Sequence, residues 1–166
     1  MICPACGTEN IQGDDLCVNC GTELAGSDKP QPGTRFEQRL LEEHLSALAN
    51  VELLSVAPEL GAAEAVRQMQ QRNIGSAVVE RDGRVVGVFT ELDALLKLTD
   101  GASPDATVDE LMTADPVVLR PDDSVAVAIH KMSVGGFRHI PLVDGGRAVG
   151  IVTARDLFRH ILKLLA

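Results

Sequence analysis

The sequence predicts an α/β protein of the mixed α+β type, in which two similar β-α-β-β-α units follow a small metal-bound segment. Two observations indicate this fold. Residues 53–96 align with residues 116–159 at a constant shift of 63 positions, and no gap is needed. All four cysteines of the 166-residue chain fall within the first twenty residues, as two CxxC pairs.

The cysteine pairs are Cys3 with Cys6 and Cys17 with Cys20. Four thiolates gathered at one point form a metal site, whereas a disulfide framework needs an oxidising compartment. The start MICPACG has neither the basic nor the apolar region of a signal peptide, so we expect a cytoplasmic protein with reduced thiols. Zn²⁺ is the usual ion for four thiolates, and iron is the alternative. We therefore predict a zinc ion bound by all four cysteines.

A glycine follows each pair, in CPACG and CVNCG, and residues 1–26 resemble the short zinc ribbons of the CPxCG…CxxCG type. So short a segment needs metal in order to fold. Many zinc ribbons contact nucleic acid, but this segment contains four acidic residues and neither Lys nor Arg. Because phosphate binding needs cations, we expect a structural or protein-contact role. A nucleic-acid-associated regulator is the alternative.

Residues 27–34, with the sequence SDKPQPGT, predict a flexible linker because they are polar and rich in Pro. Residues 35–49 predict an amphipathic helix that must pack its apolar face on another surface, because apolar residues recur there at helical spacing. The apolar residues of this segment are Phe36, Leu40, Leu41, Leu45 and Leu48.

Composition excludes several classes of function. The chain is 45% apolar with a net charge of −9, and no apolar run approaches the roughly 18 residues of a transmembrane helix. The acidic balance argues against nucleic acid and anionic membranes as partners. The sequence has no P-loop, no nucleophile elbow and no HExxH motif, and a metal held by four cysteines has no open position. We therefore expect no enzymatic activity.

Each repeat predicts the order strand, helix, strand, hairpin, strand, helix. The first strand reads LLSV or VVLR, and the helix after it reads AAEAVRQM or VAVAIHKM. The next strand reads SAVVE or HIPLVD, and RDG or DGG supplies a tight turn with positive φ. RVVGVFT or RAVGIVT forms the third strand, before a closing helix. Neither copy can cover both faces of its own sheet, so we expect the two to pack together.

The motifs GVFTELD and GIVTARD, with LMTADPVV and FRHIPLVD, resemble tandem CBS domains, which are named after cystathionine β-synthase and paired as a Bateman module. The resemblance assigns repeat 1 to residues 45–100 and repeat 2 to residues 107–166. It implies a pseudo-twofold module with a regulatory role and an adenosine-type ligand: AMP, ADP, ATP or S-adenosylmethionine. It also implies a homodimer formed through helical faces. Small apolar residues suggest two such faces, on the helices carrying Ala62, Ala65, Val66 and Met69 or Ala126, Ile129 and Met132. The helix at 35–49 and the apolar tail at Ile161, Leu162 and Leu165 are expected to extend the contact.

The T-x-x-D motif supports two interpretations. A Thr at the end of a strand can cap the next helix together with an acid three residues later, which needs no ligand. Alternatively, the helix N-terminus favours anions, and an ionised Asp can accept hydrogen bonds from two ribose hydroxyls. Gly87, which has no side chain, would let a ligand approach the strand. The chain is therefore either a ligand sensor or a ligand-free structural or oligomerisation module.

The resemblance places each ligand across both copies, with the ribose on T-x-x-D of one copy and the base on the other. The first site then consists of Val88, Thr90, Asp93, Thr113, Val118, Phe137, Arg138 and His139. The second consists of Ile151, Thr153, Asp156, Asn50, Ser55, Ile74 and Ser76. Repeat 1 departs from the family pattern, because Gly75 stands where repeat 2 has Arg138. Since a guanidinium group suits phosphate, we expect a nucleotide to prefer the first site.

Overall fold

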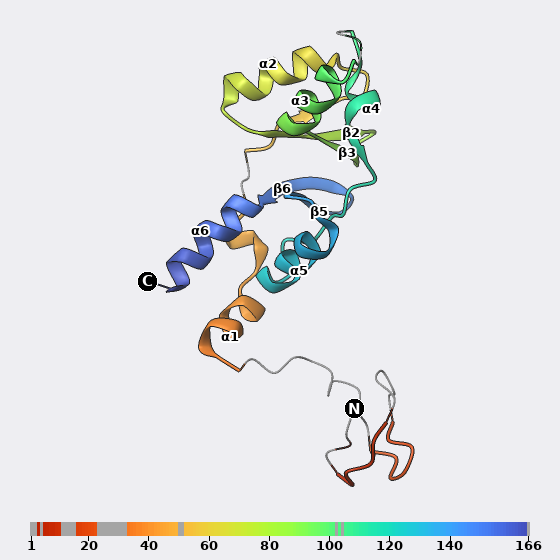
Figure 1. Ribbon diagram of the computed structural model, residues 1–166, viewed down its shortest axis with the longest axis vertical. Helices are drawn as coiled ribbons and strands as arrows, with labels where there is room; N and C mark the ends of the chain where they lie inside the picture. Colours follow the sequence, from red (N-terminus) through yellow and green to blue (C-terminus); the bar gives the residue numbers. More distant parts are fainter. Residues whose placement is uncertain are drawn as a thin grey trace. The chain divides into compact units, whose positions relative to one another are not determined.

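The computed structural model describes residues 3, 5–10, 16–22, 33–49, 52–101, 103 and 105–165. The chain divides into two compact units, Met1–Glu37 and Gln38–Ala166, and both repeats belong to the second (Figure 1). Residues 27–32 of the expected linker and the expected site residue Asn50 lie outside the described residues. Among the helices of the described ranges, none is long and apolar enough to cross a bilayer.

Repeat 1 builds a four-stranded sheet in the order β1-β2-β3-β4, in which only the β1–β2 pair is parallel. The last strand lies within the sequence range of repeat 2 but completes the sheet of repeat 1. The elements are β1 (Ser55–Val56), α2 (Ala62–Arg72), β2 (Ser76–Arg81), β3 (Arg84–Thr90), α3 (Glu91–Thr99), α4 (Val108–Leu111) and β4 (Thr113–Ala114).

Repeat 2 forms the antiparallel pair β5–β6, and its first strand is reduced to a single parallel bridge between Leu119 and Leu142. The register of the hairpin shifts at Val79/Glu80 in repeat 1 and at the matching Leu142/Val143 in repeat 2. The two copies therefore share a bulge as well as a motif. The elements are α5 (Val125–Gly135), β5 (His139–Asp144), β6 (Arg147–Thr153) and α6 (Ala154–Leu165).

The hairpin turns are formed as the sequence predicts. Asp82 and Gly83 have φ of 53° and 71°, and Gly145 and Gly146 have φ of 57° and 88°. Two consecutive residues with positive φ form a tight turn whose twist matches the right-handed twist of the flanking strands. Each pair of antiparallel strands is therefore connected by a short loop. Both hairpins carry the T-x-x-D motif at the end of their second strand.

Each repeat has its own aliphatic core. Phe89, Val79 and Met69 are fully buried in repeat 1, and Ile140 and Val152 are fully buried in repeat 2. The small residues of α2 and α5 belong to these cores, as Ala62, Ala65 and Ala128 are also fully buried. The helix faces that we expected to form a dimer are therefore largely used inside each repeat. The physical reason is that α2 and α5 bury their apolar stripe on their own sheets.

The segment 35–49 does not form one continuous helix. The helix α1 spans Arg35–Glu42, and a 3₁₀ turn, η1, spans Leu45–Ala47. The helix ends because the next amides bond elsewhere: Leu45 N donates to Asp123 O at 2.9 Å and Ser46 N to Pro121 O at 2.8 Å. Leu45 is fully buried in the core of repeat 2. The apolar stripe thus packs on another surface as expected, here on the main domain, although the backbone is not helical throughout.

The two repeats contact each other through their strands, while the helices lie on the outer faces (Figure 1). The contacts join β3 to β5 and β6. At the edge of this interface, Ala148 N of repeat 2 donates a hydrogen bond to Glu80 Oε1 of repeat 1 at 3.3 Å. The arrangement is the expected pseudo-twofold module, and it brings both T-x-x-D motifs to one central region.

Candidate functional site

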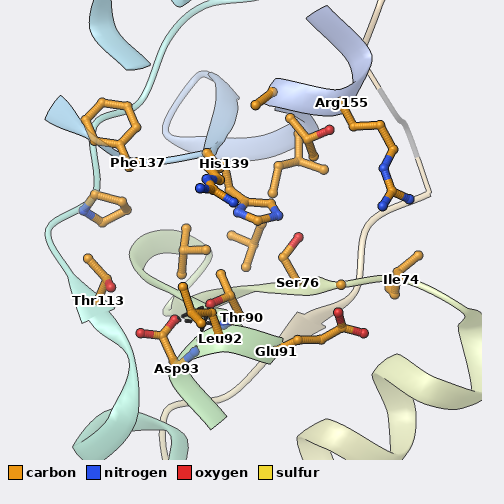
Figure 2. Close-up of a pocket in the computed structure, with 18 of the residues that line it drawn as sticks. Ile74, Ser76, Thr90, Glu91, Leu92, Asp93, Thr113, Phe137, His139 and Arg155 are labelled. Carbon is orange, nitrogen blue, oxygen red and sulfur yellow. Dashed lines mark hydrogen bonds between the residues drawn. The ribbon is translucent and has the colours of Figure 1, made fainter. Parts of the chain in front are cut away.

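A single cleft of about 1220 Å³ lies between the two repeats, and both T-x-x-D motifs line it (Figure 2). It contains most of the residues predicted for the two ligand sites. Those residues are Val88, Thr90, Asp93, Thr113, Phe137, Arg138, His139, Ile151, Thr153, Asp156, Ile74 and Ser76. The predicted sites are therefore two ends of one cleft, which we name the Asp93 half-cleft and the Asp156 half-cleft.

Two other predicted residues lie away from the cleft lining, and both are exposed. Ser55 pairs with Val78 in the sheet, between the buried Leu54 and Val56, so strand alternation turns its side chain outward. Val118 precedes the buried Leu119 and is 42% exposed. Both predicted residues thus have side chains that are turned away from the buried face of their strand and that do not line the cleft.

The T-x-x-D motifs form the same hydrogen-bond pattern in both repeats. Asp93 N donates to Thr90 Oγ1 at 3.1 Å, while Asp93 Oδ2 accepts from Thr90 N at 3.0 Å and from its hydroxyl at 2.6 Å. The corresponding distances between Asp156 and Thr153 are 3.2, 3.0 and 2.5 Å. Each motif is thus a complete capping box that uses one carboxylate oxygen, Oδ2. The second oxygen, Oδ1, takes no part in the cap.

The second oxygen has different surroundings in the two repeats. Asp93 Oδ1 lies 3.4 Å from Lys97 Nζ. In the part of the chain that the structure describes, no ion pair involves Asp156. A ribose hydroxyl approaching Asp93 would therefore share that oxygen with an ammonium group, whereas one approaching Asp156 would not.

The cleft also contains charged residues that the predicted sites lacked. Arg155 and Arg159 of α6 line it, and so does Glu91, the first residue of α3. No ion pair between described residues engages either arginine or Arg138. Glu91 N donates to Gly75 O at 3.1 Å. A Cβ added at Gly75 would lie 3.3 Å from Glu91 Oε2, so the carboxylate rests over the bare glycine backbone.

The sequence places Arg155 at the start of the helix that carries Asp156, as a cation that could serve that site, whereas Glu91 and Arg159 were not predicted. Glu91 and Arg155 stand at variable positions of T-x-x-D, as T-E-L-D and T-A-R-D, and therefore carry no family signal. Helical spacing would have indicated Arg159, since it follows Arg155 by one turn. Comparing the two copies position by position is the sequence signal that could have found Glu91 and Arg159.

His139 lies in the middle of the cleft, where β5 begins, and the labelled side chains of both repeats surround it (Figure 2). Burial lowers the pKa of its imidazole, and the carboxylates of Asp93, Asp156 and Glu91 counteract that effect. The burial effect prevails, so the ring is neutral at pH 7. A neutral imidazole can both donate and accept a hydrogen bond.

Two glycines near the cleft have packing roles. A Cβ at Gly87 would collide with the Met112 side chain, so this glycine accommodates Met112 and not a ligand, contrary to our expectation. A Cβ at Gly135 would collide with the ring of Phe137, so the bare backbone at Gly135 lets that ring fold over the end of α5. The second glycine thereby helps to place Phe137 in the cleft.

The four cysteines gather in the first unit, with all of their sulfur atoms within 4.8 Å of one another. Two turns of the same form present them: Gly7 N donates to Cys3 O and Gly21 N to Cys17 O, each at 2.9 Å. Both glycines have φ near +70°, where a residue with a side chain would be strained. The donor set and its close spacing fit a tetrahedral four-thiolate metal site.

The surroundings of the sulfur atoms favour negative charge at two of the four positions. The hydrogen bond with the Thr8 side chain lowers the pKa of Cys6 to about 5, and the amide of Cys20 lowers the pKa of Cys17. Burial raises the pKa of Cys3 to about 11. A bound cation would favour the thiolate form at all four, because metal binding displaces the thiol protons.

Comparison with known proteins identifies the main domain. The CBS domain family matches the chain twice, over residues 45–100 and 108–163. The chain belongs to the CBS domain family. Both matches begin after the cysteine segment, which lies outside them.

The relatives of this CBS pair include proteins known from sequence and from structure. An uncharacterized 17.7 kDa protein of Acidianus ambivalens is 37% identical over 122 residues, which cover 72% of this chain and 74% of the relative. An uncharacterized conserved protein of Pyrococcus horikoshii superposes with a TM-score of 0.67 at 30% identity, covering 72% of this chain and 92% of that one. The match spans only 35% of a longer Methanocaldococcus jannaschii protein.

One solved relative contains ligands. The CBS domain pair of protein MJ0100, in complex with 5′-methylthioadenosine and S-adenosyl-L-methionine, superposes with a TM-score of 0.66 at 25% identity. The superposition covers 71% of this chain and 98% of that one. Both ligands of that relative are adenosine derivatives.

Proposed function

We propose that this CBS pair is a regulatory, non-catalytic module that senses an adenosine-type ligand in the cleft between its repeats. The observation that supports this most strongly is the convergence of two complete T-x-x-D capping boxes on one cleft, each with a carboxylate oxygen outside the cap. The adenosine ligands of the MJ0100 pair support the same ligand class.

The carboxylate oxygen outside the cap is the proposed ribose contact. Thr90 fixes Asp93 Oδ2 with two hydrogen bonds, so Oδ1 has a defined position from which to accept a ribose hydroxyl. The base would then lie against the opposite repeat, near Phe137 and His139 for the Asp93 half-cleft. A ligand that contacts both repeats would hold them together, which stabilises the folded state by mass action.

Isothermal titration of the full chain tests the proposal. AMP, ADP, ATP and S-adenosylmethionine are titrated separately, and we expect binding heat for at least one of them. The Asp93→Ala/Asp156→Ala double variant, checked for folding by circular dichroism, should give none. Absence of heat with all four ligands would leave T-x-x-D as a helix cap only, and the chain as a ligand-free structural or oligomerisation module.

The cysteine segment is, in the same proposal, a zinc ribbon that serves a structural or protein-contact role. The support is the close four-sulfur cluster, with Cys3 and Cys17 buried and Cys6 and Cys20 exposed. Zn²⁺ would be held by all four thiolates. Such a site has no open position for a substrate, so the metal would supply folding energy and no chemistry. Zinc analysis of the purified protein, with iron measured in the same sample, tests the assignment.

We also propose a cytoplasmic homodimer. The reduced four-cysteine cluster suits a reducing compartment. Large apolar side chains are exposed on the two closing helices: Leu92, Leu95 and Leu96 on α3, and Phe158, Leu162 and Leu165 on α6. Contiguous apolar surface of this kind is typical of a protein contact. The α6 face contains Leu162 and Leu165 of the expected C-terminal contact, and α3 takes the place of α2, whose small residues are buried in the core of repeat 1.

A further inference from the structure

The two half-cleft walls carry different charges at matching positions. The shift of 63 residues pairs Leu92 with Arg155 and Leu96 with Arg159, so only the helix of repeat 2 presents cations. The same shift pairs Glu91 with Ala154 and Gly75 with Arg138. The two ends of the cleft have the same backbone motif. Any difference in their ligand preference must therefore come from these differing side chains.

In the Asp156 half-cleft, α6 supplies positive charge from one face. Arg155 and Arg159 are one helical turn apart, so their side chains project from the same side of α6, and both line the cleft. Figure 2 shows the Arg155 side chain extending from α6 toward the part of repeat 1 that contains Ile74. Between described residues, neither guanidinium group forms an ion pair.

The facing wall of the Asp156 half-cleft supplies negative charge. Glu91 begins α3 of repeat 1, and its carboxylate lies over Gly75, between Ile74 and Ser76 in sequence. Its amide bonds Gly75 O at 3.1 Å, which fixes the start of α3 to this wall. The Asp156 half-cleft thus has arginines on one side and a carboxylate on the other.

The Asp93 half-cleft has a different distribution. Its facing wall carries Arg138 and the uncharged Ala154, whose amide bonds Arg138 O at 2.9 Å. The helix that caps at Thr90 presents Leu92 where α6 presents Arg155. A ligand arm there therefore meets a cation opposite it, and an alanine stands in the place of Glu91. The cleft-lining acid Asp115 matches the cleft-lining Glu52, so that position carries an acid in both repeats.

We infer that the Asp156 half-cleft selects an adenosine-type ligand whose 5′ arm carries both charges, as in the amino-acid arm of S-adenosylmethionine. Arg155 and Arg159 bind the carboxylate of the arm, and Glu91 binds its ammonium group. A phosphate arm would meet the same arginines but would face Glu91, and an uncharged arm would use neither wall. This inference rests on the proposed function, because it assumes that the Asp156 half-cleft binds an adenosine.

Three probes separate the contributions of the arm. 5′-Methylthioadenosine lacks the amino acid, S-adenosylhomocysteine has the zwitterionic arm without the sulfonium charge, and AMP has a phosphate. Each is titrated into the Asp93→Ala variant of the full chain, so that the Asp156 half-cleft reports alone. We expect S-adenosylhomocysteine to bind about tenfold or more tightly than either other probe. If Asp93→Ala does not fold, Asp93→Asn is the alternative background, because it keeps an oxygen for the helix cap and removes the oxygen proposed to accept the ribose hydroxyl.

The residues are tested by changing one charge at a time. Glu91→Gln and Arg155→Gln should each weaken the binding of S-adenosylhomocysteine by about tenfold more than the binding of 5′-methylthioadenosine. The matched control is Lys163→Gln, which removes a cation of α6 that lies outside the cleft lining. It should leave the ratio of the affinities for S-adenosylhomocysteine and 5′-methylthioadenosine unchanged. Fold is checked for every variant by circular dichroism.

The outcomes distinguish this inference from the proposed function. Equal affinities for S-adenosylhomocysteine and 5′-methylthioadenosine would overturn the inference and leave adenosine binding intact. A preference that survives both Glu91→Gln and Arg155→Gln would overturn the residue assignment. Absence of binding by all three probes, in the variant and in the unmodified chain, would remove the proposed function itself.

Discussion

Lys97 Nζ lies 3.4 Å from Asp93 Oδ1 and donates a hydrogen bond to Leu111 O at 2.5 Å. The lysine therefore joins the T-x-x-D carboxylate of repeat 1 to the end of α4, which directly precedes Thr113 of the cleft. His160 stands at the matching position of α6 and pairs with Glu43, between α1 and η1. Each closing helix is thus tied, at the matching position, to the entry segment of the other repeat: Lys97 through a backbone carbonyl and His160 through a carboxylate.

The capping boxes should contribute stability even without ligand. Thr90→Val removes the hydroxyl that accepts from Asp93 N, so the free energy of unfolding should fall by about 1 kcal/mol. Thr90→Ser keeps a hydroxyl, so its free energy of unfolding should stay close to that of the unmodified chain. Urea unfolding at pH 7 in ligand-free buffer measures both. Equal stability of the Val and Ser variants would show that the cap contributes nothing.

A nucleotide should prefer the Asp93 half-cleft, because Arg138 stands opposite its ribose site, whereas Gly75 occupies the matching position of the Asp156 half-cleft. A phosphate bonded to a guanidinium group is worth about 1.5–3 kcal/mol, or roughly ten- to a hundredfold in affinity. Asp93→Ala should therefore remove most of the rise in melting temperature that AMP causes, and Asp156→Ala should remove less. Thermal unfolding with and without AMP measures the effect.

The ranking of the two half-clefts needs a control that separates loss of ligand binding from loss of helix capping. Both substitutions also remove a helix cap, so each melting temperature is compared with that of the same variant without AMP. Arg138→Gln leaves both caps intact and should weaken the binding of AMP by the same factor of roughly ten to a hundred. Equal loss of the AMP effect in the two Asp variants would contradict the ranking.

The sequence predicted the repeats well because their signals are local. Alternating apolar residues, the two hairpin turns and the T-x-x-D caps each depend on a few neighbouring positions, and all three form as predicted. The cysteine cluster is equally local, since one turn presents each CxxC pair. Such features need no knowledge of what packs against them.

Other features were missed because they depend on distant contacts. The helix at 35–49 ends early since Leu45 and Ser46 bond to the 121–123 loop, which no local pattern reveals. Ser55 and Val118 face away from the cleft because of pairing in the sheet. The charges of Glu91 and Arg159 matter only once the cleft brings helices of both repeats together. Position-by-position comparison of the repeats would have identified the charges but not their neighbours.

The proposed dimer should depend on the exposed leucines of the closing helices. Leu95 is 62% exposed on α3, and Leu162 is 51% exposed on α6. Leu95→Glu or Leu162→Glu would bury a charge in an apolar contact, so each should convert the dimer to a monomer. Val134→Glu changes a still more exposed apolar residue, on α5, and should leave the dimer intact. Light scattering at tens of micromolar measures the mass, and a monomeric unmodified chain would contradict the proposed dimer.

Stability should fall with pH partly through His139. Burial lowers the pKa of its imidazole in the folded chain below the ordinary value of about 6.5. The unfolded chain therefore binds the proton first, and the contribution of a neutral His139 is present above about pH 6.5 and lost as the pH falls below it. His139→Gln should lose less stability between pH 7 and pH 5.5 than the unmodified chain. Urea unfolding at the two values measures the difference, and parallel losses would contradict it.

Removing one thiolate should release the metal without unfolding the CBS pair. Cys6→Ser leaves three thiolates, so we expect the bound zinc to fall from one per chain to none and residues 1–26 to lose their fold. The thermal transition of the main domain should not change, because the cysteine segment and residues 38–166 form separate compact units. Thr8→Val, which removes a hydroxyl beside Cys6 but keeps all four thiolates, should retain the metal. Loss of cooperative unfolding of the whole chain in Cys6→Ser would show that the segment packs into the CBS pair.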